Sequence, residues 1–349
     1  MNYPMFRTFR LAGLTAVFVM LSAHAQLHAA PRVTFELVTG NGFPLNGARK
    51  WVGLFKNLDS TTVRIRAARG SETTTVENVG TEAFPVYHVV GILLGDNRLR
   101  LLGGEFSHTD RTKIAQWIKK LRSEGVEGLT AVRVAFGLTS KQLVMFHECV
   151  SQPLAFSTKG VRAGDAVRQI VQGLKVPFEV STAGRAAFAR NEAVSDELMG
   201  ISSGTALAAT LRPLGLIWRP SKREDGEVIL SIKEASAADE SWPIGWPIKG
   251  TPRIAAPKLF ETLKVEIVDT PLSQAIEAIQ PRVKIPFLFD YNSMARHQVD
   301  PATKKVNFPS RRASYKRILD NLLFQARLRT ELRMDEAEKP FLWISTTKR

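Results

Sequence analysis

The stretch Lys284-Ile285-Pro286-Phe287 decides the fold, because the same arrangement occurs 109 residues earlier as Lys175-Val176-Pro177-Phe178. Apolar residues precede both motifs at the positions i, i+3, i+4 and i+7, namely Leu272, Ala275, Ile276 and Ile279 in the later copy and Ala163, Ala166, Val167 and Ile170 in the earlier one. This spacing predicts an amphipathic helix that leads into a short strand in each copy. The sequence therefore indicates one small structural unit that occurs twice.

The similarity continues after both motifs. A second helical stripe of apolar residues follows a polar loop in each copy, formed by Gly204, Leu207, Ala208 and Leu211 in the first and by Tyr315, Ile318, Leu319 and Leu322 in the second. Each copy then ends in a β-rich run, at residues 228–232 and 341–344. We expect the repeats to cover residues 157–235 and 259–346.

The first repeat resembles the short N-terminal (STN) domain of secretins and TonB-dependent transducers. The resemblance lies in Met199-Gly200-Ile201, Ala206-Leu207, Leu211, Leu214-Gly215-Leu216-Ile217-Trp218 and Val228-Ile229-Leu230. The second repeat is similar but departs at Ala326-Arg327-Leu328, where the glycine is missing. The resemblance implies small βα modules that bind other proteins in the periplasm. It does not imply a pore or a transport barrel, since no such sequence follows.

The rest of the chain completes an expected multi-domain α+β organisation. Residues 32–125 alternate strand-like and helix-like patterns, with Gly95-Asp96-Asn97 as a hairpin signal between two strands. A connector at residues 126–156 holds a short helix that starts at a capping box of Thr139 and Gln142. Residues 236–257 are rich in proline and predict a stiff linker, in which Trp242 and Trp246 pack against a neighbouring domain.

The first residues have the order of a secretory signal. Arg7 and Arg10 precede an apolar run that ends in Ala23-His24-Ala25. We expect residues 1–25 to be a cleaved signal peptide and the mature chain to be periplasmic or secreted, without a transmembrane segment. Cleavage after Ala30 is the second choice. Cys149 is the only cysteine of the chain, so no intrachain disulfide can form, and its apolar neighbours favour an inert thiol.

The chain carries a formal net charge of +15, and the excess is concentrated near the C-terminus. The candidate contact residues for a polyanion or a partner protein are Lys304, Lys305, Arg311, Arg312, Lys316, Arg317, Arg327 and Arg329. Such a field attracts anionic envelope polymers, lipid headgroups or acidic protein faces. A solvated helix face explains the same pattern. Nucleic acid is not expected, because the segment lacks interleaved aromatic residues.

One motif invites a catalytic interpretation. Gly200-Ile201-Ser202-Ser203-Gly204 matches G-x-S-x-G, and Asp269 or Asp290 followed by His297 completes the order of a hydrolase triad. However, no buried strand precedes the motif, and the second repeat has no equivalent. We expect instead a helix N-terminus at which Ser203 or Thr205 accepts backbone hydrogen bonds.

No cofactor, metal or catalytic residues are expected, because histidines and carboxylates are scattered. The sequence therefore favours an exported, non-catalytic protein for protein binding or envelope assembly. The alternatives are a serine hydrolase that uses Ser202 and a binder of anionic envelope polymers.

Overall fold

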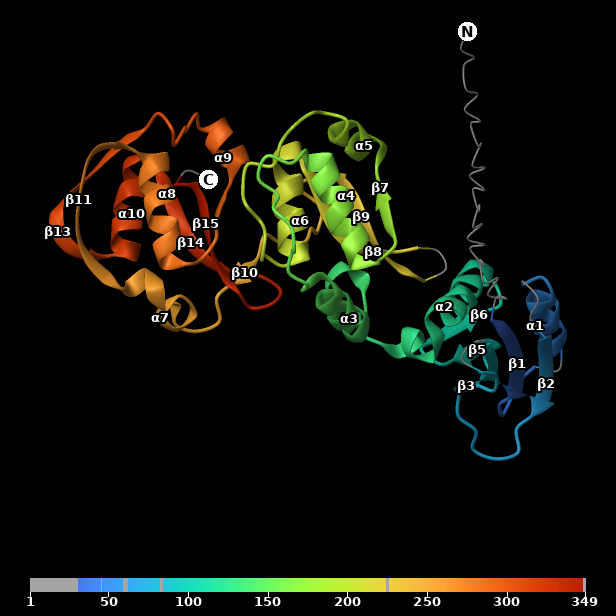
Figure 1. Cartoon of the computed structure of the whole chain (residues 1–349). Coiled ribbons are helices and arrows are strands. Elements are labelled where there is room, and N and C mark those ends of the chain that lie inside the picture. Colours follow the sequence, from blue (N-terminus) through green and yellow to red (C-terminus); the bar gives the residue numbers. More distant parts are fainter. Residues whose placement is uncertain (1–30, 45, 59–61, 82–83, 224–225, 348–349) are drawn as a thin grey trace, which may run out of the picture. The chain divides into compact units, whose positions relative to one another are not determined.

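The computed structural model describes residues 31–44, 46–58, 62–81, 84–223 and 226–347 (Figure 1). The expected signal peptide, residues 1–25, lies outside this range. The chain is 36% helix and 31% strand, in agreement with the predicted α+β class. The described residues up to 115 form one compact unit, and those from 116 onward form a second. Within the described ranges, no helix is both long and apolar enough to span a bilayer.

The first unit is built on a mixed sheet of strand order β2-β1-β4-β5-β6, with β3 paired to β4. Its elements are β1 (Arg32–Thr39), α1 (Gly47–Lys56), β2 (Thr62–Ala67), β3 (Thr75–Asn78), β4 (Val86–Leu93), β5 (Arg98–Leu101) and β6 (Gly104–Ser107). β1 is parallel to both β2 and β4. The apolar stripe of α1 buries Trp51 and Phe55, and the ring of Phe55 lies 4.5 Å from that of Phe35 on β1. The predicted hairpin is confirmed, because β4 and β5 are antiparallel.

Helix α2 (Arg111–Thr130) begins in the first unit and continues into the second. Its apolar stripe of Ile114, Trp117, Ile118 and Leu121 is buried. Gly125 interrupts the helix with a φ of 68°, a left-handed conformation that glycine adopts without steric cost. The predicted capping box is also confirmed, since Thr139 and Gln142 bond reciprocally at the start of α3 (Ser140–Val150).

The first half of the second unit packs helices on a three-stranded sheet of order β7-β9-β8. β7 is parallel to β9, and β8 is antiparallel to it. The elements after the short 3₁₀ turn η1 (Ala135–Gly137) and α3 are α4 (Ala163–Leu174), β7 (Phe178–Val180), α5 (Thr182–Phe188), α6 (Ser203–Leu211), η2 (Arg212–Leu214), β8 (Leu216–Lys222) and β9 (Val228–Glu234).

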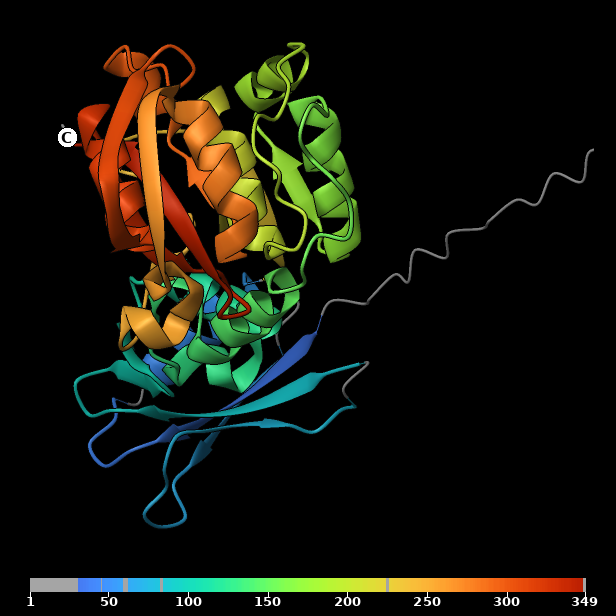
Figure 2. The same ribbon diagram turned by 60° about the vertical axis from the view of Figure 1, so that its left-hand side comes forward.

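The second half has a sheet of order β10-β14-β15-β12, in which β12 is parallel to β15 and β14 is antiparallel to it. Its elements are β10 (Trp246–Pro247), α7 (Pro252–Ala255), η3 (Pro257–Phe260), β11 (Thr262–Pro271), α8 (Leu272–Val283), β12 (Phe287–Phe289), α9 (Tyr291–Arg296), β13 (Lys305–Ser314), α10 (Tyr315–Gln325), β14 (Leu328–Met334) and β15 (Pro340–Thr346). β11 and β13 pair as a separate long ribbon that the sequence patterns did not predict (Figure 2).

The two Lys-x-Pro-Phe motifs adopt the same local structure. Lys175 and Lys284 end α4 and α8 in the left-handed conformation, with φ of 54° and 57°. The following prolines cannot continue a helix, so the chain turns into β7 and β12. The carbonyls of Pro177 and Pro286 each accept a 2.9 Å hydrogen bond from the last strand of their sheet, from the N–H groups of Leu230 and Leu342.

The segment 236–257 connects the two halves, and part of it is packed. Trp242 is 5% exposed and stacks on Trp218 with ring centroids 4.7 Å apart. β10 pairs with β14, at Trp246 opposite Met334. Trp242 thus packs on the first half of the same compact unit, whereas the prediction placed both tryptophans against a neighbouring domain. One apolar core contains residues of both halves, which explains why they form a single compact unit.

Candidate functional site

The β14–β15 hairpin joins the two halves of the second unit through two buried carboxylates. Asp335 accepts a 2.9 Å hydrogen bond from the backbone N–H of Ser202, at the start of α6. Glu336 accepts from the indole Nε1 of Trp242 at 2.7 Å and from the hydroxyl of Thr205 at 2.8 Å. Burial raises the pKa of Glu336 to about 7, although both hydrogen bonds act to lower it. A helix N-terminus favours negative charge, so α6 supplies a docking point for the hairpin.

The docking gives the G-x-S-x-G motif a structural role. The Ser202 side chain is fully buried, donates to the carbonyl of Ser151 at 3.2 Å and accepts from the N–H of Ala337 at 3.1 Å. The predicted cap by Ser203 or Thr205 is wrong, because within the described residues no backbone N–H of this helix end donates to either hydroxyl. Ser203 donates to the carbonyl of Gln152 at 2.7 Å. The helix end is occupied by the hairpin carboxylates instead.

The triad residues suggested by sequence are not brought to Ser202. Asp290 caps α9 and holds the guanidinium of Arg212 in two hydrogen bonds of 3.0 and 2.9 Å. Asp269 pairs with Lys305. The ring of His297 lies beside the hydroxyl of Thr346 and the carbonyl of Ser293.

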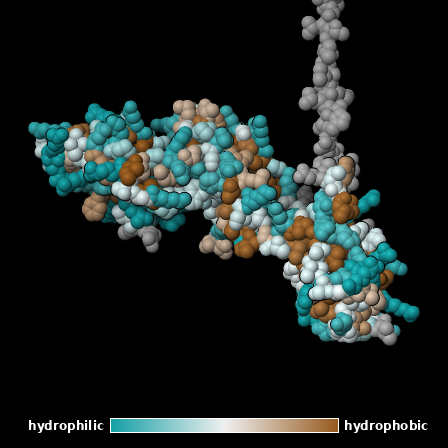
Figure 3. All heavy atoms as spheres, turned by 90° about the horizontal axis from the view of Figure 1, so that it is seen from below, coloured by the Kyte–Doolittle hydropathy of each residue, from teal (hydrophilic) through white to brown (hydrophobic). Residues whose placement is uncertain are grey.

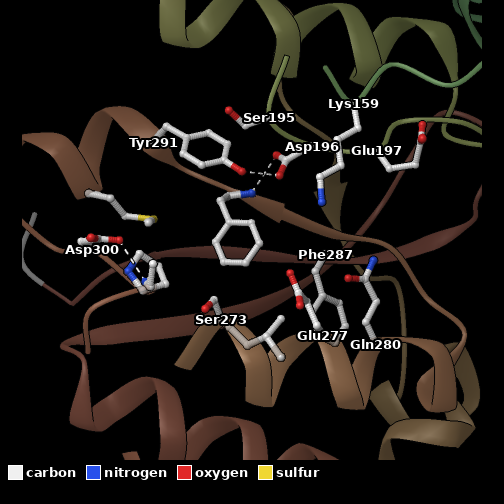
Figure 4. Close-up of a pocket in the computed structure, with 15 residues that line it drawn as sticks. Lys159, Ser195, Asp196, Glu197, Ser273, Glu277, Gln280, Phe287, Tyr291 and Asp300 are labelled. Atoms are coloured by element: carbon white, nitrogen blue, oxygen red, sulfur yellow. Dashed lines mark hydrogen bonds between the residues drawn. The ribbon is translucent and has the colours of Figure 1, made fainter. Parts of the chain in front are cut away.

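A cleft of about 280 Å³ lies between the two halves of the second unit (Figure 4). Its apolar surface comes from Ile276, Phe287, Phe289 and Met294 of the second half. The loop at residues 195–197 of the first half covers the opposite side, and α8 contributes polar residues to the rim. Apolar cavities with a few polar groups are typical of binding sites.

A short hydrogen bond closes one end of this cleft. The Tyr291 hydroxyl donates to Asp196 Oδ1 at 2.6 Å, and the N–H of Phe289 donates to Oδ2 at 3.1 Å (Figure 4). Burial raises the pKa of Asp196 to about 6, against the effect of both donors. Burial and the neighbouring Asp196 together raise the pKa of Tyr291. The pair therefore fixes the loop of the first half against β12 and α9 of the second.

The cleft is acidic although the chain is strongly basic. Its lining holds four carboxylates, of Asp196, Glu197, Glu277 and Asp300, and one cation, Lys159. Burial alone would raise the pKa of Glu197, but hydrogen bonds from Ser157, Met199 and Thr158 outweigh it and keep this pKa low. Glu277 is exposed and has no ion-pair partner among the described residues. A ligand that carries a cation next to an apolar group would complement this lining in charge and in polarity.

The eight basic residues singled out from sequence are distributed over several elements. They lie at the start of β13 (Lys304 just before it, and Lys305), near its end (Arg311, Arg312), in the first turn of α10 (Lys316, Arg317) and around the start of β14 (Arg327, Arg329). Hydrophilic side chains are abundant over the end of the second unit that β11 and β13 form (Figure 3).

The structure brings some of these cations together but not all. Arg312 lies opposite Lys264 on the β11–β13 ribbon, and Lys304 and Arg327 line one small cavity of about 230 Å³. Lys316 contacts Thr330, whereas Arg329 contacts Ser345 from the other face of β14, because successive strand residues point to opposite faces. No single face therefore carries all eight.

Two of these cations already have acidic neighbours. Lys305 pairs with Asp269 and Lys316 with Asp320, each at 2.5 Å. Lys305, Asp269 and Asp320 are exposed and Lys316 is half-buried, and ion pairs near the surface contribute little stability.

Cys149 is half-buried, and its thiol lies 3.2 Å from the carbonyl of Leu174. Burial raises the pKa of this thiol, which favours the unreactive protonated form. Within the ranges that the structure describes, no group of three histidine, cysteine or acidic side chains is arranged to hold a metal ion.

Sequence reasoning missed both the acidic cleft and the two docking carboxylates. Asp335 and Glu336 sit in a polar stretch that looks like an ordinary solvated turn. The one sequence feature that indicates this docking is Gly204, the second glycine of the G-x-S-x-G motif. A Cβ at Gly204 would collide with Glu336 and would lie 3.0 Å from Trp242 Nε1, so glycine is required there for close approach.

Comparisons with known proteins give no relative. The chain matches no family model, no curated protein and no solved structure.

Proposed function

We propose that the chain is an exported, non-catalytic binding protein whose second unit consists of two tandem STN-like modules. Equivalent structural details in the two halves support the repeat. β7, β9 and β8 have the same directions and order as β12, β15 and β14. Ser181 and Asp290, 109 positions apart, each cap the following helix with their side chains. Each also donates its N–H to the last strand, at 2.9 and 2.8 Å.

The acidic cleft is the observation that carries a binding function. Its apolar surface accommodates a hydrophobic side chain, and the carboxylates of Asp196 and Glu277 attract a cation beside it. The ligand that fits is a segment of an envelope protein with an aromatic or aliphatic residue next to lysine or arginine. The Tyr291–Asp196 bond sets the cleft before binding, which lowers the entropic cost of association.

Selection from a peptide display library tests this function. Peptides enriched on the purified wild-type chain should share an apolar residue adjacent to lysine or arginine. The variant E277K/Q280K adds three positive charges to the α8 wall of the cleft and should lose these peptides. The control E148K/Q169K adds the same charge at exposed positions of α3 and α4 outside the cleft and should keep them. Equal binding by both variants would refute the assignment of the cleft.

The exposed arginines of the β11–β13 ribbon support a second candidate function, the binding of an anionic envelope polymer. Arg311 and Arg312 are exposed, and their cross-strand neighbours are Val265 and Lys264. Binding to dextran sulfate should weaken steeply as salt rises, and R311E/R312E should abolish it. Salt-independent retention on this polymer would exclude the candidate.

The non-catalytic part of the proposal has its own test. A fluorophosphonate probe should leave both the wild type and S202A unlabelled, because the Ser202 hydroxyl is buried and bonded. Labelling of the wild type that disappears in S202A would show a hydrolase.

A further inference from the structure

A second cavity between the same two halves has the opposite charge from the acidic cleft. Its volume is about 430 Å³. The first half contributes the end of α6, η2 and β8, and the second half contributes α9, β14 and β15. Its lining includes three arginines and three tryptophans, which are Arg212, Arg296, Arg333, Trp218, Trp242 and Trp343. No carboxylate is among the described residues that line it.

Two of the arginines are held in place by the protein. Arg212 forms two hydrogen bonds with Asp290, and its guanidinium carbon lies 5.9 Å from the ring centroid of Trp343. Arg333 donates to the carbonyl of Ile244 at 2.9 Å and to Glu331 at 2.8 Å, and it lies 5.4 Å from the same indole. The cations are thus pre-positioned by carboxylates that lie outside the cavity lining and by contact with an aromatic ring.

The protein leaves part of this donor capacity unused. The Nε of Arg333 is buried and finds no hydrogen-bond acceptor in the described ranges. The two bonds from Arg212 to Asp290 use Nε and Nη2, so Nη1 has no acceptor in that pair. The Arg296 side chain is exposed at the end of α9 and makes no ion pair or hydrogen bond within the described residues. Guanidinium stays charged at all physiological pH values and offers five donors, so these groups remain ready for an external acceptor.

We propose that this cavity binds a small molecule that carries an oxyanion, either a carboxylate or a phosphate. Arg296 and the free edge of Arg212 contact the oxyanion, because the planar fork of arginine matches both groups. The volume lies in the range of small-molecule sites, about 300 to 1,000 Å³. The partly exposed Ile217 and Pro243, which also line the cavity, provide the apolar part of the site. This site is separate from the acidic cleft and does not depend on the proposed peptide binding.

A purely structural explanation makes a different prediction about one residue. Arg212 links the two halves, and Arg333 links β14 to the segment that connects them, so the loss of either perturbs folding whether or not a ligand exists. Arg296 has no such link. If the arginines served only to hold the halves together, substitution of Arg296 would have no effect on any ligand.

Isothermal titration of the full-length chain with four probes tests the proposal. The probes are inorganic phosphate, glucose 6-phosphate, glutarate and uncharged glucose. We expect saturable binding of at least one anion and none of glucose. R296Q should weaken that binding by about tenfold to a hundredfold, the equivalent of one or two charge-assisted hydrogen bonds.

The matched control is R282Q, which removes an exposed arginine from α8 outside the cavity and should bind like the wild type. Quenching of tryptophan fluorescence should follow the same binding curve, since three tryptophans line the site. Preference for glucose 6-phosphate or for glutarate identifies the phosphate or the carboxylate as the natural group. Absence of saturable binding of every anion, or equal affinity of R296Q and R282Q, would overturn the proposal.

Discussion

Replacement of Glu336 by glutamine should remove a specific part of the pH dependence of stability. Burial raises the pKa of this carboxyl from 4.5 to about 7 in the folded chain. Below pH 4.5 the group is protonated in both the folded and the unfolded state. Between pH 4.5 and 7 only the folded state keeps the proton, so the free energy of unfolding falls as the pH rises. A shift of about 2.5 pKa units at about 1.4 kcal/mol each corresponds to about 3 kcal/mol.

The assay is urea denaturation at pH 4, 6 and 8, followed by tryptophan fluorescence and near-UV circular dichroism. Five of the six tryptophans of the chain belong to the second unit, so these signals report mainly on it. The difference in unfolding free energy between E336Q and the wild type should rise by about 3 kcal/mol in favour of E336Q from pH 4 to pH 8. Glutamine is close in shape and can still accept from Trp242.

E338Q is the control, because Glu338 is exposed on the same hairpin. It should preserve the pH profile of the wild type. A difference between E336Q and the wild type that stays constant with pH would refute the burial of a titrating carboxyl at this position.

Three further predictions test the packing of the second unit. G204A should lower the free energy of unfolding, measured in urea, by about 2 to 4 kcal/mol, because the added Cβ displaces Glu336 from its donors. The control G173A adds a Cβ that meets open space on a helix, and it should raise this free energy by up to about 1 kcal/mol. Y291F should destabilise the second unit more at pH 8 than at pH 5, because the hydrogen bond from the Tyr291 hydroxyl stabilises the ionised form of Asp196. An equal loss of stability at both pH values would contradict this. Cys149 should react slowly with Ellman's reagent in the native chain and rapidly in urea, and equal rates would show that its thiol is not protected.

Local sequence signals predicted the elements of the fold well. Helix stripes with residues at i, i+3, i+4 and i+7 correspond to the buried faces of α4 and α8. Each Lys-x-Pro-Phe motif correctly marked the end of a helix and the start of a strand, since proline excludes both a helical continuation and a helical residue before it. These signals act within one or two helical turns, which is the range that sequence periodicity reports.

The β11–β13 ribbon and the acidic cleft were not predicted for a common physical reason. β13 follows β11 only after α8, β12 and α9, so its pairing depends on how those elements pack. Asp196 meets Tyr291 across 95 positions of the sequence, and Glu336 meets Thr205 across 131. No periodicity connects residues at such distances. A polar residue that will be buried has the same local pattern as one that stays in water.

The G-x-S-x-G motif shows how the two halves depend on each other. In the first half alone, α6 would begin with unsatisfied backbone N–H groups, and the hydroxyl of Thr205 would lack its acceptor. The second half supplies both missing acceptors from its hairpin, Asp335 to the N–H of Ser202 and Glu336 to Thr205. This docking holds the walls of the acidic cleft and of the arginine-lined cavity in place, because both sites take residues from each half. Loosening of the hairpin by ionisation of Glu336 should therefore weaken ligand binding at both sites together, while substitutions in one cavity should leave the other unchanged.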